Sequence, residues 1–471
     1  MSALLIHKKL IRKELASLTD WSATNPRKPL IIRGARQVGK STLVRQFAET
    51  NNLSLLEINF ERNPEYRETF ASKDPSQILI ALNLLTNKKI IVGSTLLFLD
   101  EIQAAPEALA ALRYFYEEKS ELHVIAAGSL LEFALADAQF SMPVGRVEYL
   151  HLGPMQFEDF LQAMGYSELA QHLQALSLAD IRNQVMLKPV HEKYMALLKQ
   201  FWIVGGLPEA VARYAATQDF SEIARIQQSI VATYRDDFNK YSQGKLKALI
   251  QMVFDQLPVM VGRKFKYAQI SSDHRSAELD EALQQLCMAR VAAKVHHTSA
   301  NGVPLGAEIN QRFFKTLYLD IGLMCAALKL NVLDLSKDDL SLINKGALAE
   351  QFVGQQLMYS GLYYETPALY YWVREAKSAA AEIDYLLTCG QAIIPVEIKA
   401  GTTGSLKSLH QFLKEKNRSF GLRFNADMPS LLSDAKKLTD GTTINYELLS
   451  LPLYLVGQTQ RLMRDCLNKK D

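Results

Sequence analysis

The chain has 471 residues, of which 48% are hydrophobic and 22% are charged. This length predicts about three domains, and the composition is that of globular domains that each bury a core. The formal net charge of +3 is too small to define a partner, so any contact with nucleic acid requires a local basic patch.

Neither a disulfide framework nor a zinc site is predicted, because the cysteines have no paired spacing. No apolar run reaches the roughly 18 residues that span a bilayer. The opening MSALLIHKKLIRKEL predicts a short amphipathic helix that Lys and Arg interrupt too often for a signal peptide. We therefore expect a reduced, cytoplasmic setting and no membrane. The cysteines are Cys287, Cys325, Cys389 and Cys466.

A phosphate-binding loop is predicted in RKPLIIRGARQVGKSTLVRQFAE, where an apolar strand precedes a GxxxxGK[ST] loop and a helix follows it. In such a loop the backbone N–H groups cradle phosphate oxygens, Lys40 reaches the β- and γ-phosphates, and the Ser41 hydroxyl binds Mg²⁺. ATP and Mg²⁺ are the expected cofactors. The predicted nucleotide-binding residues are Gly34, Ala35, Arg36, Gln37, Val38, Gly39, Lys40, Ser41 and Thr42.

A second predicted strand ends in two acids, since four apolar residues precede Asp100 and Glu101 in STLLFLDEIQ. Asp100 is predicted to lie on the metal side of the nucleotide, and Glu101 to polarise the attacking water as the catalytic base. The alternative is that both acids are simply exposed at the end of a strand. Together with the loop, this motif predicts an ATPase core.

Two further strands are predicted at 53–61 and 122–129, and the alternation of strands and helices predicts a parallel sheet covered on both faces. At this point the sequence resembles the AAA+ branch of P-loop ATPases, whose members carry a polar γ-phosphate sensor where Ser129 ends its strand. Arg146 resembles the arginine before the last core strand of bacterial AAA+-like ATPases. That resemblance implies an arginine finger or sensor for its own or a neighbouring chain's nucleotide, and a surface ion pair is the alternative.

The pattern from about 157 to 241 is helical and predicts a lid over the nucleotide, with GGLPEAV as a break between helices. From about 245 to 329, two or three helices and the hairpin-like AAKVHHTSANGVPLG, with a turn at Asn301-Gly302, predict a winged-helix arrangement. One reading of this region is DNA contact, and the other is a structural or protein-docking wing. The phosphate-contacting residues in the first reading are Arg263, Lys264 and Lys266.

A β-hairpin is predicted in AEIDYLLTCGQAIIPVEIKAG, with Gly390-Gln391 as its two-residue turn. This register places Asp384 opposite Glu397, and like charges about 5 Å apart are unfavourable unless a cation or a proton compensates them. Mg²⁺ does so naturally, so Asp384 and Glu397 are predicted metal ligands. The alternative is the solvated face of a small sheet, and a slip of one residue would remove the pairing.

The same register places Glu382 opposite Lys399, which is an ordinary ion pair. Lys399 shares the face of Glu397 and is predicted to orient or help deprotonate a metal-bound water that attacks a phosphodiester.

This constellation resembles the PD-(D/E)XK nuclease superfamily, with an acid on one strand, E-x-K on the next, and a preceding helix that bears another acid. The resemblance gives site roles to Glu350, Asp384, Glu397 and Lys399, and matches Gln411 in the following helix to a polar residue often found there. Many chains of this superfamily have lost cleavage while keeping the fold, so both an active and an inactive site fit the pattern.

The whole layout resembles a widespread bacterial family that joins an AAA+-like ATPase domain to a carboxyl-terminal domain of unknown function. The motifs are GARQVGKS, LLFLDEIQ, AAGSLLEF, GGLPEAV, FKTLYLDIGL, GALAEQFVGQQL, YYWVRE, EIDYLL and PVEIKAG. The resemblance implies ATP binding and no particular biological role. The expected α/β fold comprises an AAA+-like P-loop parallel-sheet core at 1–155, a helical lid at 156–242, a winged-helix-like region at 243–330 and a restriction-endonuclease-like PD-(D/E)XK domain at 331–471.

The leading functional hypothesis is an ATP-hydrolysing protein that acts on DNA, in which the nucleotide state changes how the winged helix and the nuclease-like domain sit on the duplex. The alternative is a signalling switch, in which ADP and ATP states expose or hide a protein-docking surface and the tail is a catalytically dead nuclease fold. In a third reading the tail is only a dimerisation module. DNA, a protein partner and a second copy of the chain all stay open as partners.

Overall fold

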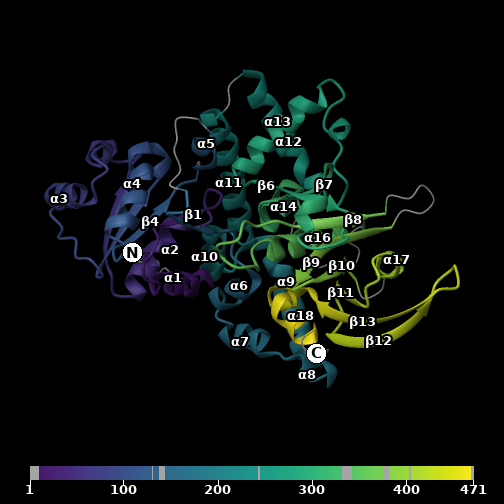
Figure 1. Cartoon of the computed structure of the whole chain (residues 1–471). Coiled ribbons are helices and arrows are strands. Elements are labelled where there is room, and N and C mark those ends of the chain that lie inside the picture. Colours follow the sequence, from purple (N-terminus) through teal and green to yellow (C-terminus); the bar gives the residue numbers. More distant parts are fainter. Residues whose placement is uncertain are drawn as a thin grey trace.

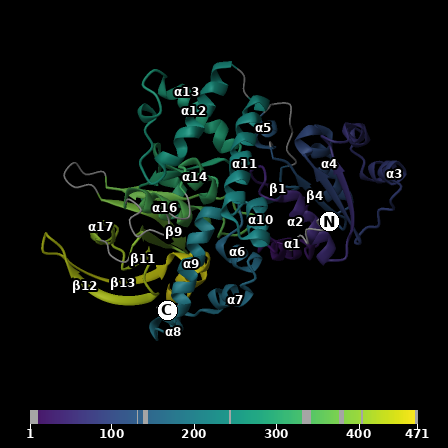
Figure 2. The ribbon, with the colours of Figure 1, turned by 180° about the vertical axis from the view of Figure 1, so that it is seen from behind.

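The computed structural model describes residues 10–129, 131–136, 144–241, 244–330, 342–374, 381–401 and 405–467. The amino-terminal region forms one side of the molecule and the carboxyl-terminal strands form the other, with the teal helices between them (Figure 1). The view from behind gives the same arrangement (Figure 2). One large buried cluster joins the two sides, since it contains Leu30 of the first sheet and Leu451 of the second.

In the described chain, five parallel strands form the amino-terminal sheet in the order β2-β3-β4-β1-β5. Alternate residues of β3 belong to different buried clusters, Phe98 to one and Leu99 to the other, so both faces are covered. The predicted parallel sheet is therefore confirmed, and β4 separates β1 from β3. The strands are β1 Leu30–Arg33, β2 Ser54–Asn59, β3 Thr95–Asp100, β4 His123–Ala127 and β5 Glu148–His151; the helices are α1 Glu14–Ser22, α2 Lys40–Thr50, α3 Pro75–Thr86, α4 Pro106–Glu118 and α5 Leu131–Ala136.

The chain after β5 is helical as far as Tyr241, as the pattern predicts. The GGLP break lies between α9 and α10, where Gly205 has a φ of 74° and a Cβ would lie 2.1 Å from Asp320 Oδ1. Only glycine fits this position, because it combines positive φ with a close approach. The helices are α6 Phe157–Ala163, α7 Ser167–Ala175, α8 Leu178–Arg182, α9 Lys188–Val204, α10 Pro208–Thr217 and α11 Phe220–Tyr241.

The second sheet of the described chain has eight strands in the order β12-β13-β11-β10-β9-β8-β6-β7. The predicted wing, β6 and β7, joins this sheet through β8, so the sheet continues across the domain boundary predicted at residue 330. The strands are β6 Ala292–Thr298, β7 Ile309–Tyr318, β8 Tyr370–Val373, β9 Glu382–Cys389, β10 Ala392–Ile398, β11 Phe420–Asn425, β12 Ser430–Lys437 and β13 Thr443–Pro452; the helices are α12 Gly244–Met260, α13 Ser276–Met288, α14 Ile321–Ala327, α16 Leu342–Met358, α17 Lys407–Glu415 and α18 Thr459–Leu467.

The turn predicted at Asn301-Gly302 is wrong, because residues 299–308 connect β6 to β7 and include a 3₁₀ turn at Leu305–Glu308. Pro304 has no N–H to donate, so the ladder cannot continue through this segment.

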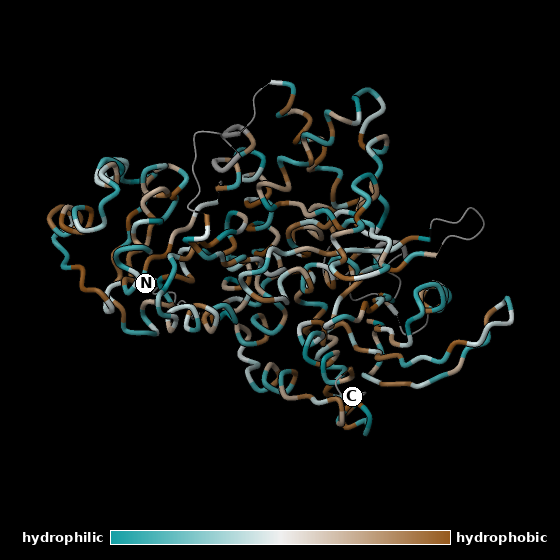
Figure 3. The backbone as a smooth tube through the Cα atoms, in the orientation of Figure 1, coloured by the Kyte–Doolittle hydropathy of each residue, from teal (hydrophilic) through white to brown (hydrophobic). Residues whose placement is uncertain are grey.

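The turn of the β9–β10 hairpin is as predicted, since the ladder pairs Cys389 with Ala392 and runs to Tyr385 opposite Val396. Around this hairpin the order is α16, then antiparallel β8, β9 and β10, then α17, then β11 parallel to β10. The inner strands are mostly brown in Figure 3, whereas the β12–β13 hairpin extends outward. None of the described helices is long and apolar enough to cross a membrane.

Candidate nucleotide site and carboxyl-terminal acid cluster

The loop between β1 and α2 is an open anion cradle. Gly39 precedes α2 with a φ of 91°, and no side chain caps the first turn, which leaves its N–H groups available to phosphate. Lys40 Nζ donates to two loop carbonyls, Gly34 O at 3.0 Å and Ala35 O at 2.8 Å. A Cβ on Gly34 would lie 2.3 Å from Leu152 O, so this close turn needs glycine.

The ammonium of Lys40 is buried and has only neutral partners. Burial lowers its pKa to about 8, although Glu101 and Asp100 act in the opposite direction. The group therefore carries its charge at neutral pH without a salt bridge in this structure, and that charge is available to a phosphate.

Ser41 and Asp100 meet at the carboxyl ends of the strands. Ser41 Oγ donates to Asp100 Oδ2 at 3.0 Å, and Asn59 Nδ2 donates to the same oxygen at 3.3 Å. Burial raises the pKa of Asp100, the neighbouring Glu101 adds to that shift, and these hydrogen bonds oppose it. A hydroxyl and a carboxylate side by side are oxygen ligands that fit Mg²⁺, which would neutralise phosphate charge when it is bound with the nucleotide.

Glu101 is held by two donors in the left-handed region, with a φ of 50°. Gln103 Nε2 donates to its Oε2 at 2.8 Å, and the backbone N–H of Ser129 donates to the same oxygen at 3.4 Å. Two polar oxygens beside it, Gln103 Oε1 and Ser129 Oγ, are buried and have no protein partner in the described residues. This arrangement places a carboxylate beside unpartnered polar oxygens just after β3 and β4, a combination that suits a general base.

Gln103 stands within one turn of Glu101 in DEIQ, but no motif marks it as a functional residue. Gly128 leaves room for it, because a Cβ there would lie 2.1 Å from Gln103 Oε1.

Two further contacts on the cradle were also missed. Arg12 is buried and donates to Val38 O at 2.7 Å from the segment before α1. On the lid side, Arg36 forms an ion pair with Asp237 of α11, and Tyr234 Oη donates to Arg36 O at 2.7 Å. The predicted lid is thus fastened to the phosphate-binding loop.

Arg146 lies at the end of the sheet opposite to Lys40, which follows the carboxyl end of β1. It precedes β5, which runs parallel to β1, so it lies beside the amino-terminal ends of the strands. Its Nε donates to Glu117 Oε1 at 2.9 Å, near the end of α4. The structure therefore separates Arg146 from its own nucleotide site, and a role towards a neighbouring chain's nucleotide stays a prediction.

The carboxyl-terminal acids gather around a lysine that the sequence analysis did not include. Lys315 of β7 is 1% exposed. Its Nζ lies 2.9 Å from Glu350 Oε1, 2.5 Å from Glu382 Oε1 and 3.8 Å from Asp384 Oδ1. Lys315 lies on β7, which is far from the acids in the sequence and not adjacent to β9 in the sheet, so no local pattern indicates this contact.

The hairpin itself differs from the predicted pairing at its open end. Asp384 Oδ2 accepts a hydrogen bond from the backbone N–H of Ile398 at 2.7 Å. Lys399 forms its ion pair with Glu397 rather than with Glu382. Glu397 is 5% exposed, whereas Glu382, Asp384 and Lys399 on the same side of the hairpin are partly exposed.

Burial governs the titration of these groups. It raises the pKa of Glu350 and of Glu397 to about 7 each, and it raises the pKa of Asp384. Burial also opposes the charge on Lys315, but Glu350, Asp384 and Glu382 together outweigh it and raise the lysine pKa. The surrounding acids therefore favour the charged form of the lysine.

The metal site predicted at Asp384 and Glu397 lacks structural support. Over the ranges that the structure describes, no three or more His, Cys, Asp or Glu side chains are arranged to hold a metal. Lysine ammonium groups lie where the cation is predicted. Gln411 does not join the acids, since its Nε2 donates to Glu415 Oε1 at 2.7 Å.

A basic loop lies directly against the acid cluster. A Cβ on Gly262 would lie 3.1 Å from Glu350 Oε2, so the backbone of the loop touches this acid. Lys264 Nζ lies 3.5 Å from the ring centroid of Phe313, a half-exposed side chain on β7. Four exposed cations beside the acids form what we call the basic rim: Arg263, Lys264, Lys266 and Arg312.

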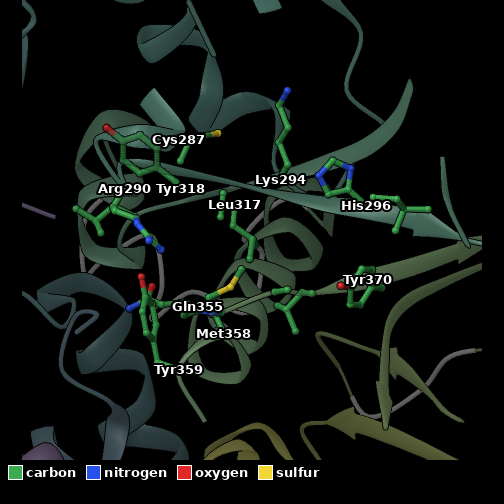
Figure 4. A pocket seen from close by; sticks show the side chains of 17 residues that line it. Cys287, Arg290, Lys294, His296, Leu317, Tyr318, Gln355, Met358, Tyr359 and Tyr370 are labelled. Carbon is green, nitrogen blue, oxygen red and sulfur yellow. The ribbon is translucent and has the colours of Figure 1, made fainter. Parts of the chain in front are cut away.

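A cavity of about 380 Å³ lies between β6, β7 and the end of α16 (Figure 4). Its two cations are already paired, Arg290 with Glu132 at 2.9 Å and Lys294 with Asp280 at 2.8 Å. Lys294 points away from the cavity in Figure 4. The cavity therefore has no free charge to fix a polar ligand, and it is not a candidate site.

Comparison with family models finds three matches along the chain. Residues 26–161 match an AAA domain, residues 195–334 match a domain of unknown function, DUF8612, and residues 345–443 match another, DUF4143. The first match and the geometry above define an AAA-like P-loop domain of the ATP-binding class. The other two matches are to domains of unknown function, so they give no information about activity.

Solved structures of low similarity include the Walker-type ATPase of Pyrococcus abyssi, with 14% identity, 68% of this chain and 96% of that chain covered, and a TM-score of 0.42. The ORC2 protein of Aeropyrum pernix, in ADPNP-ADP complexes, has 13% identity, coverage of 70% and 90%, and a TM-score of 0.28. The RuvB Holliday junction branch migration motor of Thermotoga maritima has 13% identity, coverage of 60% and 88%, and a TM-score of 0.27. Likeness at this level carries no inference about function. A comparison with curated proteins finds no match.

Proposed function

We propose that this chain is an ATP-hydrolysing AAA-like protein that binds DNA along the basic rim of its carboxyl-terminal domain. The observation that carries the DNA part is the contact of Gly262 with Glu350, because it places the basic loop beside the nuclease-like acids. Exposed Arg and Lys side chains with an aromatic ring among them suit a phosphate backbone.

The hydrolytic step uses the residues of the nucleotide site in separate roles. Lys40 binds the β- and γ-phosphates, and Ser41 with Asp100 would hold Mg²⁺. Glu101 polarises the attacking water and takes its proton, while Gln103 keeps the carboxylate in place. Ser129 Oγ, which is buried without a protein partner, is free to contact the γ-phosphate as a sensor.

The order of elements in the second sheet supports a nuclease-like fold. The acid-bearing helix α16 comes first, Asp384 lies on the second strand after it, Glu397 lies on the third, and Lys399 directly follows that strand. This is the order that the PD-(D/E)XK resemblance implies. We propose binding rather than cutting, because Lys315 already compensates the acids.

A continuous set of hydrogen bonds offers a route from the lid to this domain. Asp320 Oδ2 accepts from the backbone N–H of Gly206 at 2.7 Å and from Gln355 Nε2 at 3.2 Å. Gln355 belongs to α16, the helix that carries Glu350. Movement of the lid on ATP hydrolysis would therefore reach the basic rim through α16.

A signalling switch with a catalytically dead tail is the second candidate. The observation that favours it is the compensated acid cluster, which needs no nucleic-acid chemistry to explain it. In that case a protein partner binds in one nucleotide state, and DNA does not bind at low salt.

The test is the affinity of the full chain for a labelled DNA duplex, measured by fluorescence anisotropy at two salt concentrations. The triple substitution Arg263→Ala, Lys264→Ala, Lys266→Ala is expected to weaken binding at least tenfold and to reduce the salt dependence. The matched control removes three exposed lysines of the ATPase side: Lys73, Lys88 and Lys89. DNA affinity that is absent in the wild type, or equal in both triple variants, would reject the proposal.

A further inference from the structure

We propose that the ammonium group of Lys315 is the built-in cation of the acid cluster, and that the cluster takes no divalent metal while this group is present. The inference rests on the nuclease-like domain of the proposed function and deepens it. The PD-(D/E)XK resemblance implies Mg²⁺ beside Asp384 and Glu397, and the residues present do not fit that ion.

The strand that carries Lys315 is hydrogen-bonded along both of its edges. It belongs to the part of β7 that pairs with β6, where it lies opposite Val295. Its neighbour Phe314 accepts a hydrogen bond from the backbone N–H of Phe265 at 2.9 Å on the other edge. The strand is therefore held on both sides, and burial together with the ion pairs to Glu350 and Glu382 keeps the ammonium among the acids.

One oxygen of each acid is engaged by a protein group, whereas Glu397 Oε2 is buried without a partner among the described residues. Mg²⁺ needs a near-octahedral set of oxygens at about 2.1 Å and binds through carboxylates and water. A metal bound here would lie close to the Lys315 ammonium, and the like charges would repel. The engaged oxygens are Glu350 Oε1 and Glu382 Oε1 with Lys315, Asp384 Oδ2 with Ile398 N–H, and Glu397 Oε1 with Lys399.

The two lysines compensate part of the negative charge of the acids. Lys315 and Lys399 already supply two positive charges to this cluster of four carboxylates. Removal of the Lys315 ammonium would leave Glu350, Glu382 and Asp384 close together without a counter-ion. Such a group of acids binds a divalent cation. The substitution Lys315→Met should therefore create a metal site that the wild type lacks.

The experiment measures Mn²⁺ binding to the nucleotide-free full chain by electron paramagnetic resonance. Wild type and Asp384→Asn are expected to bind the same amount of Mn²⁺, because the cluster contributes nothing. Lys315→Met is expected to bind one additional equivalent, which is lost again when Asp384→Asn is added. The matched control is Lys294→Met. Lys294 lies on the adjacent strand β6 and forms an ion pair with Asp280 of α13.

Two results would overturn the proposal. One is Mn²⁺ binding in the wild type that disappears in Asp384→Asn, and the other is a folded Lys315→Met protein with no additional Mn²⁺. If Lys315→Met fails to fold, the comparison of wild type with Asp384→Asn still decides. DNA binding is measured separately by anisotropy. A chain that binds neither Mn²⁺ at the acid cluster nor DNA would contradict the proposed function but not this inference.

Discussion

The nucleotide site and the acid cluster each combine a buried lysine with carboxylates, yet they treat the ammonium differently. In the nucleotide site, Lys40 donates only to neutral carbonyl oxygens. In the acid cluster, Lys315 lies within ion-pair distance of three carboxylates. The Lys40 ammonium is therefore available to a ligand, whereas the Lys315 ammonium is already paired with carboxylates of the protein itself.

Burial disfavours the charge on both lysines, but the net pKa shifts are opposite because different sets of acids surround them. Desolvation lowers the pKa of Lys40 to about 8 because the acids near it compensate only in part. The carboxylates around Lys315 outweigh desolvation and raise its pKa. A buried charge without a direct partner is costly, and a protein retains it where a ligand supplies the partner.

The largest effect is expected from Glu101→Gln in the nucleotide site. Loss of the general base should lower the rate of ATP hydrolysis by about 10²- to 10⁴-fold, while ATP affinity changes little. Phosphate release and nucleotide-binding assays on the full chain measure the two quantities. Glu118→Gln, on the exposed end of α4, is the control. A variant that hydrolyses ATP at the wild-type rate would show that this site does not use its acids for catalysis.

In the acid cluster, Lys315→Met should destabilise the protein by about 3–5 kcal/mol, because it leaves buried carboxylates without a counter-ion. Urea unfolding measures the loss. Addition of Glu350→Gln should recover part of it, since one uncompensated charge is removed. Lys294→Met serves as the control, and its salt bridge is only partly buried. A loss no larger than that of the control would contradict the contrast between the two lysines.

The pH dependence of ATP affinity tests the lowered pKa of Lys40. The group is charged below its pKa of about 8 in the empty site and keeps its proton when a phosphate is bound. Affinity should therefore be constant below that pH and fall by up to about tenfold per pH unit above it. Titrations with ATP across this range measure the slope. Lys40→Ala should bind weakly with no such slope, and a wild-type affinity independent of pH would contradict the prediction.

The smallest effect is expected from Gln103→Ala. Loss of its hydrogen bond to Glu101 should slow ATP hydrolysis by about fivefold, the equivalent of about 1 kcal/mol. KM should not change, because Gln103 makes no contact with the cradle carbonyls. Steady-state kinetics separate the two constants, and Gln103→Glu would repel Glu101 and slow the reaction further. An unchanged kcat would show that Gln103 does not position Glu101.

The local features of the two sites followed well from the sequence. The loop from Gly34 to Ser41 has its own turn and helix signals, and it forms as the pattern predicts. Gly390-Gln391 likewise fixed the register of its hairpin, because a two-residue turn determines which residues face each other. These predictions depend on residues close together in the chain.

Predictions that depend on distant segments were less successful. The wing was expected in a region of its own, but β6 pairs with β8 and enters the second sheet. The position of Arg146 became clear only from the direction of β5 beside β1. No periodicity encodes which strands become neighbours, because strand order is decided by packing of whole faces.

The sequence by itself determined that the chain has a phosphate-binding loop, a strand that ends in two acids, and a hairpin that brings Asp384 towards Glu397. Only the tertiary structure decided what surrounds those acids. The packing of β7 and α16 brings Lys315 to the acids, and the loop after α12 places Gly262 against Glu350. The reason is physical: short-range turn and helix signals act within a few residues, whereas the charge balance of a buried site depends on every strand that packs around it.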